Sequence, residues 1–446
     1  MNPTHTLSNA DYRRLKNLNV AQWLDQELSL FLIWDYINVA KNTDIAKDVP
    51  KAFSAHSKFI VEKYKKYLPM FGAIDRRWRF IEKLAVHRSG KKKILFQNVK
   101  YVSFMQAARK KYHVAMVVEG KKDRLFAMRH GLEYLVVTEL YQYISDYLES
   151  NDATFLRKLV EVVKQKLEVL QPDFVVFGLD LLPIDRALII AAHELSIPTV
   201  VIQHGLQDIN FPLLDCRACD YILTWGQHFK DLWCQQDIVE PENIYILGYP
   251  YAVPKNKKVS SLPQKVLCYL GQDYERYNND LWNVKLKTLQ DLSLLCKKLG
   301  LTFLYSPHRG DNREQIAKHF PDMLMTSKSQ SLDQLLMQPY VFVSFSSTAL
   351  LSAAIRSNIT LQLRNYPIAS ENFQMLGVAS ASCNTIEELQ KQIEKILQAK
   401  HSYTFRLAHF NNGYIETRYA ATQRFLEILK DLELKNASKV KKDFNQ

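Results

Sequence analysis

The stretch VFVSFSSTALLSAAI, residues 341–355, places a short apolar strand directly before hydroxyl side chains and then a helix rich in alanine and leucine. Hydroxyls at a helix start accept hydrogen bonds from backbone N–H groups that have no intrahelical partner. The same N–H groups attract anions, particularly phosphate. A single hydroxyl is enough for a cap, whereas Ser346, Ser347 and Thr348 supply three. The stretch therefore predicts a strand–helix unit with an anion-binding helix start.

Strands and helices alternate on both sides of this stretch. Apolar strand segments are predicted before it at 93–99, 114–120, 173–180, 199–205, 220–226 and 243–250, and in the second half at 265–272, 301–308, 339–346 and 359–365. Unbroken apolar strands that alternate with helices are typical of parallel sheets covered on both faces. The predicted fold class is α/β, with two Rossmann-like, doubly wound parallel-sheet domains facing a cleft.

The pattern changes divide the chain into five parts. Long amphipathic segments predict a helical N-terminal region, and a polar segment with two prolines and a lysine cluster predicts a linker. The last helix, over about 415–433, is expected to cross back to the first domain. The expected parts are a helical region 1–90, a first Rossmann-like domain 91–250, a linker 251–264, a second Rossmann-like domain 265–432 and a basic tail 433–446.

The composition favours anionic partners. The 446 residues carry a net charge of +13, concentrated in short lysine clusters. Because no nucleic-acid-binding signature accompanies the charge, nucleotide substrates or an anionic membrane surface are favoured over nucleic acid. The cysteines lack framework spacing, and the N-terminus lacks a signal-peptide pattern. We expect a cytoplasmic protein, peripheral at the inner face of the cell membrane.

Chemically capable residues fall at the predicted strand ends, where ligands of doubly wound sheets bind. In the second domain these are Gly271, Gln272, His308, Arg309, Ser344, Ser346, Ser347 and Thr348. In the first domain they are Glu119, Asp180, Gln203, His204 and Asp208. The absence of a G-x-G-x-x-G or Walker sequence removes the usual support for dinucleotide and P-loop sites.

These residue types predict different roles for the two domains. Arg309 offers a planar fork for phosphate oxygens, and His308 offers a donor that offsets charge on a departing phosphate. His204, with Asp208 nearby, is a candidate base for an acceptor hydroxyl. Glu119 and Asp180 are further base candidates, and the sequence does not rank the three. Each residue also has a structural explanation, such as an ordinary helix cap or a surface loop.

The loop YSPHRGDN (305–312) followed by SFSST (344–348) resembles the His-Pro and Ser-Ser/Thr motifs of bacterial GT-B sialyltransferases and polysialyltransferases. Proline precedes the histidine here instead of following it, and only Val118-Glu119-Gly120 matches the acidic base motif of that family. The resemblance implies that 265–432 binds a CMP-activated nonulosonic acid and 91–250 an acceptor. His308 would then assist CMP departure, and Ser346, Ser347 and Thr348 would hold the phosphate or the sugar carboxylate.

The predicted function is therefore transfer of a sialic- or pseudaminic-type sugar from a CMP donor to a surface polysaccharide or lipid-linked glycan. No cofactor or metal is expected, since no Asp-x-Asp sequence indicates a divalent ion. IPTVVIQHG (197–205) also resembles CDP-glycerol and CDP-ribitol phosphotransferases and Kdo transferases of capsule synthesis, which remain alternatives. A non-catalytic scaffold of capsule assembly is a third. Donor sugar, acceptor, linkage and stereochemical outcome stay open.

Overall fold

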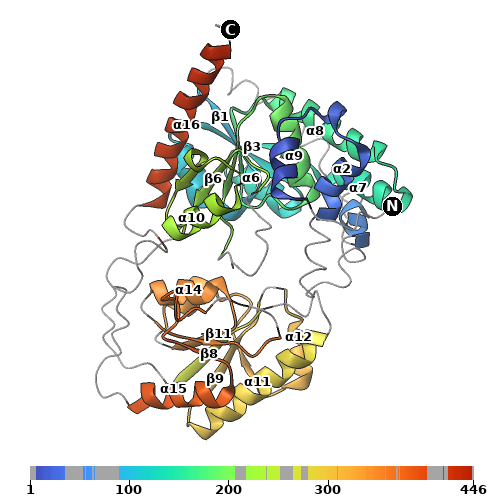
Figure 1. The fold of residues 1–446 in the computed structure, drawn as a ribbon. Helices are drawn as coiled ribbons and strands as arrows, with labels where there is room; N and C mark the ends of the chain where they lie inside the picture. The colour runs from blue at the N-terminus through green and yellow to red at the C-terminus, as the bar shows by residue number, and fades with distance from the viewer. Residues whose placement is uncertain are drawn as a thin grey trace.

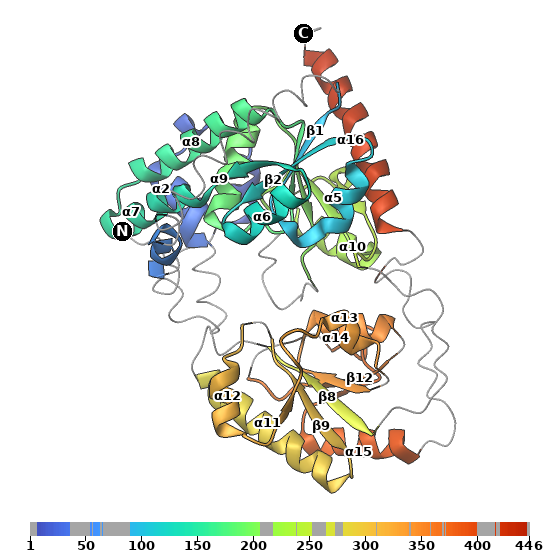
Figure 2. The ribbon, with the colours of Figure 1, turned by 180° about the vertical axis from the view of Figure 1, so that it is seen from behind.

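The protein is known as a computed structural model that describes residues 7–35, 90–205, 217–237, 239–251, 265–272, 280–308, 310–338, 340–356, 358–367, 372–398 and 420–443, with short pieces at 54–55, 57–62, 65, 370 and 415. These residues form two all-parallel sheets, each enclosed by helices (Figures 1 and 2). The predicted fold class is confirmed.

The first sheet has seven strands in the order β3-β2-β1-β4-β5-β6-β7. They are β1 (Lys93–Phe96), β2 (His113–Val118), β3 (Glu133–Val136), β4 (Phe174–Phe177), β5 (Thr199–Ile202), β6 (Tyr221–Thr224) and β7 (Ile244–Ile246). Strand order reverses between β1 and β4, so the carboxyl ends of these two strands flank the switch point where ligands of such sheets bind. Strand β3 was missed by the sequence-based prediction.

Helices cover both faces of this sheet. They are α5 (Val102–Ala108), α6 (Lys121–Arg129), α7 (Tyr141–Ser150), α8 (Thr154–Leu170), α9 (Pro183–Glu194) and α10 (Gln227–Gln236). Successive residues of β1 enter opposite cores, because side chains alternate along a strand. Leu95 joins the core that contains α8 and α9, whereas Ile94 and Phe96 join the core that contains α5.

The described part of the N-terminal region packs onto this domain. It comprises α1 (Asn9–Leu15), a 3₁₀ turn (Val20–Gln22), α2 (Asp25–Ser29) and a π-helical turn (Leu30–Trp34). Tyr12, Leu28 and Phe31 belong to the same core as α8 and α9. Arg186 of α9 pairs with Asp35 at 3.2 Å, and both side chains are at most 2% exposed. The first helices are therefore an integral layer of the first domain.

The second sheet has six strands in the order β10-β9-β8-β11-β12-β13. They are β8 (Val266–Leu270), β9 (Thr302–Ser306), β10 (Leu324–Met325), β11 (Val341–Ser344), β12 (Ile359–Leu363) and β13 (Ala381–Cys383). The helices are α11 (Asp280–Lys298), α12 (Arg313–His319), α13 (Leu332–Leu336), α14 (Thr348–Ile355) and α15 (Ile386–Gln398). The edge strands β10 and β13 were not predicted.

The last helix, α16 (Ala421–Asp443), returns to the first domain, as predicted. It packs against α5, and the Phe425 ring lies 5.1 Å from that of Phe104 and 6.0 Å from that of Phe96. Figures 1 and 2 show it alongside the first sheet. The helix includes residues that were assigned to a basic tail from 433 onward. Nearly all of the predicted linker, 252–264, lies outside the described residues.

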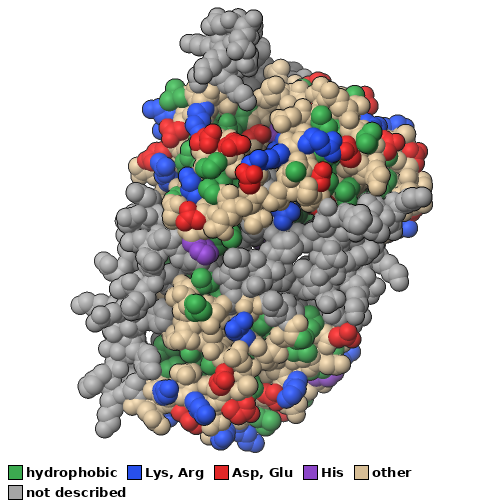
Figure 3. Space-filling model, viewed as in Figure 1, with side chains coloured by type: hydrophobic (Ala, Val, Ile, Leu, Met, Phe, Trp, Pro, Cys, Tyr) green, Lys and Arg blue, Asp and Glu red, His purple; other side chains and the backbone are tan. Residues whose placement is uncertain are grey.

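No helix among the described residues is long and apolar enough to cross a bilayer. In the view of Figure 3, acidic and basic side chains are interspersed over the coloured surface of both domains.

Candidate functional site

The second domain places two predicted site residues at its own switch point. Strand order reverses between β8 and β11, which are neighbours in the sheet. Gln272 follows β8 and Ser346 follows β11. The Ser346 backbone N–H donates to Gln272 Oε1 at 3.0 Å, and Gln272 Nε2 donates to Ser346 Oγ at 3.2 Å. The paired side chains thus connect the two strand ends across the switch point.

The serines at the end of β11 and the start of α14 have different roles. Ser344 is fully buried and donates from Oγ to the Leu270 carbonyl at 2.9 Å, so it joins β11 to β8. Ser347 is the N-cap of α14, and its Oγ accepts from the Ala349 N–H at 3.2 Å. The helix dipole and the first-turn N–H groups favour an anion there. Ser346 and Ser347 therefore remain ligand candidates, while Ser344 holds the sheet together.

A pocket of about 760 Å³ opens beside this helix start. Gly271, Ser347 and His308 all line it, so the structure brings the helix start and the histidine loop to one cavity, as predicted. Ser327 and Lys328, which follow β10, also line it. The sequence-based prediction missed them because β10 itself was not recognised. Arg309 lies outside the described residues.

The His308 ring has a defined tautomer. The Gly310 N–H donates to His308 Nδ1 at 3.2 Å, so Nδ1 is an acceptor. In the neutral imidazole the proton therefore sits on Nε2. This nitrogen can donate a hydrogen bond to a phosphate oxygen, which is the role predicted for His308.

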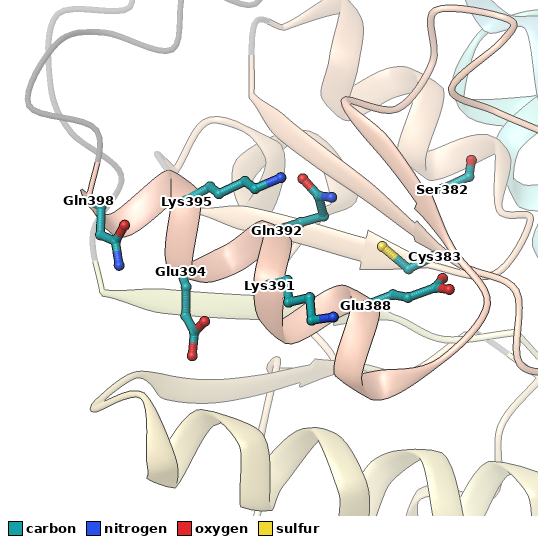
Figure 4. Close-up of a pocket in the computed structure, with 8 residues that line it drawn as sticks. All are labelled: Ser382, Cys383, Glu388, Lys391, Gln392, Glu394, Lys395 and Gln398. Atoms are coloured by element: carbon teal, nitrogen blue, oxygen red, sulfur yellow. The ribbon is translucent and has the colours of Figure 1, made fainter.

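Two other pockets lie on the outside of the second domain. One of about 430 Å³ runs along α15, which Figure 1 shows at the end of this domain farthest from the first domain. Figure 4 shows that its side chains do not converge, since Glu394 and Gln398 point away from Cys383. Another lies between α11 and α15. Neither pocket is lined by Gly271, His308 or Ser347.

His204 follows β5 in the first domain and has the opposite tautomer. Its Nδ1 lies 3.1 Å from the Gly178 carbonyl oxygen, which can only accept, so Nδ1 carries the proton. Nε2 is then the basic nitrogen of an exposed side chain. Lys100 Nζ donates to the His204 carbonyl at 2.9 Å, and Tyr101 donates to the Gln203 carbonyl at 3.0 Å. The loop is thereby fixed in a form that suits a general base.

Two predicted residues of this domain are buried and have structural partners. Gln203 is fully buried, and its amide bridges the Gly205 carbonyl and the Trp225 N–H. Asp180 is 1% exposed and accepts from the Ala218 N–H at 2.9 Å. Their positions support roles in shaping the His204 loop and its surroundings and give no support to direct acceptor contact. Asp208 lies outside the described residues.

Glu119 lies at the end of β2 and is partly buried. Burial, with a smaller contribution from Asp123, raises the pKa of the Glu119 carboxyl above its ordinary value, against a hydrogen bond from Tyr141 that lowers it. Burial and the charge of Glu119 likewise raise the pKa of Asp185 well above its ordinary value. Raised carboxyl pKa values are common at functional sites. Glu119 thus stays the alternative base candidate.

The two domains touch through the elements that carry these residues. A Cβ atom on Gly205 would lie 3.2 Å from Thr348 Oγ1, so the first turn of α14 approaches the His204 loop closely. Tyr249, which follows β7, shares a 2.6 Å hydrogen bond with Ser352 of α14. The segments that follow β5 and β7 therefore meet α14 of the second domain. Within the described residues, no group of three or more His, Cys, Asp or Glu side chains could hold a metal ion.

Two parallel-sheet domains facing a cleft, with the last helix returned to the first domain, define a GT-B-type architecture. No protein-family model matches the chain, and no curated protein matches its sequence. Solved structures share the fold. UDP-GlcNAc 2-epimerase from Neisseria meningitidis bound to UDP-GlcNAc aligns with TM-score 0.52 and 12% identity, over 76% of this chain and 100% of the other. The Methanocaldococcus jannaschii enzyme in complex with UDP-GlcNAc and UDP aligns with TM-score 0.50 and 16% identity, over 76% and 99%.

Proposed function

We propose that this protein is a glycosyltransferase that takes a nonulosonic acid from a CMP donor and passes it to a glycan acceptor of the cell surface. The observation that carries the proposal is the cavity where His308 and the N-cap of α14 meet beside the Gln272–Ser346 pair. A nucleotide phosphate is the ligand that suits a helix start with hydroxyls and a histidine donor.

In this proposal the second domain stabilises the leaving group. The phosphate accepts hydrogen bonds from the first turn of α14 and from Ser346 or Ser347. His308 donates from Nε2 to a phosphate oxygen as the glycosidic bond breaks, and Lys328 adds a positive charge at the rim. Donors aimed at developing charge lower the barrier without a metal ion. The proposed enzyme therefore needs no cofactor and no divalent cation.

The first domain activates the acceptor. His204 presents its basic Nε2 from the loop that touches Thr348, so it can remove the proton of an acceptor hydroxyl held in the cleft. Glu119 is the alternative base. The lysine clusters of the sequence would place the enzyme near anionic lipid, where a lipid-linked acceptor is made.

A second candidate is favoured by the solved neighbours, whose structures contain UDP or UDP-GlcNAc. In that case the same pocket binds a UDP-sugar, and the enzyme rearranges or transfers that sugar. CDP-polyol phosphotransfer is a further alternative with similar nucleotide recognition. The three candidate functions are distinguished by the nucleotide that binds and by the product that forms.

The test is product analysis with CMP-sialic acid, CMP-pseudaminic acid, UDP-GlcNAc and CDP-glycerol, each offered with capsule oligosaccharide and with EDTA present. The proposal predicts CMP release with sugar transfer from a CMP donor only. H308A should lose about 100-fold or more in rate, because it removes a donor to the leaving group. H319A, a surface histidine of α12 that bonds its own helix, is the matched control. If the protein turned over only UDP-GlcNAc or only CDP-glycerol, the proposed CMP-linked donor would be wrong.

A further inference from the structure

A buried carboxylate lies directly behind the His308 loop. Asp311 Oδ2 accepts from the His308 backbone N–H at 2.7 Å and from the Tyr305 hydroxyl at 2.6 Å. Asp311 Oδ1 accepts from Lys285 Nζ at 2.6 Å. The Asp311 N–H in turn donates to the His308 carbonyl at 3.0 Å. One side chain therefore ties the loop to β9 and to α11.

The partners of Asp311 are themselves fixed. The side chains of Lys285 and Asp311 are both 0% exposed. Tyr305 is fully buried, stacks on Tyr269 with ring centroids 6.0 Å apart, and lies against Gly271 so closely that a Cβ there would be 2.4 Å from its hydroxyl. Burial raises the pKa of Tyr305 well above its ordinary value, so its hydroxyl stays a donor. Through Tyr305, the buried residues around Asp311 contact Gly271, which lines the pocket.

A buried ion pair of this kind is weak as a device for stability alone. Desolvation of both charges offsets most of their attraction, and well-packed apolar residues often serve the fold equally well. What apolar residues cannot replace is the acceptor that Asp311 offers to the His308 N–H and to Tyr305. The geometry thus gives the carboxylate a second role beside packing.

We propose that Asp311, held by Lys285 and Tyr305, is a positioning residue that sets the backbone and the ring of His308 toward the pocket. The inference rests on the proposed function for its effect on rate. The loop geometry that it describes stands independently of the donor. With Asp311 in place, the Gly310 N–H reaches Nδ1 and leaves the proton of the neutral ring on Nε2.

The test compares two double variants that remove the same pair of charges. In K285M/D311N the amide oxygen still accepts from Tyr305 and from the His308 N–H, whereas K285M/D311L has no acceptor. Both avoid an uncompensated buried charge. The tautomer of His308 is read in ¹⁵N-histidine-labelled protein by two-bond ¹H–¹⁵N correlation, with H308N assigning the signals. CMP affinity and the rate of CMP release from CMP-sialic acid are measured on the same proteins.

We expect K285M/D311N to keep the Nε2–H signature and a rate near that of the wild type. K285M/D311L should show averaged tautomer signals and a rate lower by about 100-fold, the size expected for a misplaced catalytic group, with CMP affinity close to the wild-type value. The proposal would be wrong if both double variants kept the wild-type His308 signals and rate, or if both lost them. Should K285M/D311L fail to fold, Y305F removes a single donor, and wild-type His308 signals and rate in Y305F would overturn it equally.

The positioning role of Asp311 and the proposed function can fail separately. Loss of the Nε2–H signature in K285M/D311L, in a protein whose wild type binds neither CMP nor UDP, would uphold the positioning role and reject the proposed function.

Discussion

Gly205 of the first domain lies against Thr348 of the second, with a distance of 3.2 Å between the position of a Gly205 Cβ and Thr348 Oγ1. Gly205 follows His204, and Thr348 is the first residue of α14. The candidate base and the candidate phosphate site are therefore joined by a contact in which even a methyl group on Gly205 would crowd Thr348 Oγ1. Gly205 does not adopt the left-handed backbone conformation, so a substitution there is opposed by the crowding of Thr348 and not by backbone strain.

This contact predicts coupling between Gly205 and Thr348. G205A forces Thr348 Oγ1 to give way, and T348A removes the obstacle. We expect the free energies of unfolding of G205A, T348A and the double variant to be non-additive by about 1 kcal/mol, with the double variant more stable than the sum predicts. Urea unfolding of the four proteins measures this. Additive values would mean that the domains do not meet at these residues.

Gly271 is predicted to be the least tolerant glycine of the site. A Cβ there would lie 2.4 Å from the Tyr305 hydroxyl and 2.9 Å from two ring atoms. The ring is fully buried and cannot swing away, so G271A should cost about 1–3 kcal/mol, as overpacking does. Thermal unfolding checks the loss. G120A is the control, because the nearest atom to its Cβ position is 4.0 Å away and its backbone is extended.

The N-terminal helices are predicted to be essential to the first domain. D35A leaves the Arg186 guanidinium, 1% exposed, without its carboxylate partner. An uncompensated buried charge costs about 3–5 kcal/mol, whereas D35A/R186M removes both charges and should be less destabilised than D35A. Denaturant unfolding compares the variants. A double variant no more stable than D35A would show that packing, and not charge, makes this contact matter.

The raised pKa of Glu119 predicts that the stability of the folded protein depends on pH. Below its ordinary pKa of 4.5 the carboxyl is protonated in both the folded and the unfolded chain. As pH rises, Glu119 ionises first in the unfolded chain, because burial raises its pKa in the folded state. The folded state therefore loses stability relative to the unfolded state until the pH exceeds the pKa of Glu119 in the folded state. E119Q should therefore be more stable than the wild type at pH 7 and equal to it at pH 4. Urea unfolding at both values tests the sign, and a wild-type protein favoured at pH 7 would contradict it.

The sequence predicted the parts of the fold that local pattern controls. Strands such as β8 and β11 are continuous apolar runs, and the start of α14 carries its own cap. The edge strands β10 and β13 are two and three residues long, so they form through pairing with a neighbouring strand and leave no pattern of their own. Asp180 and Ser344 have the right chemistry at strand ends, but both are buried and bonded to the backbone, Asp180 to the Ala218 N–H and Ser344 to the Leu270 carbonyl.

The burial of Lys285 could have been predicted from the sequence. It lies four residues after Leu281 and four before Leu289, which are both buried on α11, so helical spacing places it on the inward face. A lysine on that face needs a buried acid. Only the folded chain identifies Asp311, whose position three residues after His308 otherwise suggests a solvent-exposed turn.

Calorimetric titration of CMP, CDP, UDP and GDP into the wild type, S346A and Q272A, with S150A as a surface control, tests whether the ends of β8 and β11 bind a nucleotide. We expect one cytidine nucleotide to bind the wild type, and both site variants to weaken its binding about tenfold or more, since each disturbs a hydrogen bond to a charged group or its support. S150A should bind as the wild type does. Binding that ignores both site variants, or no binding of any nucleotide to a folded protein, would contradict the account.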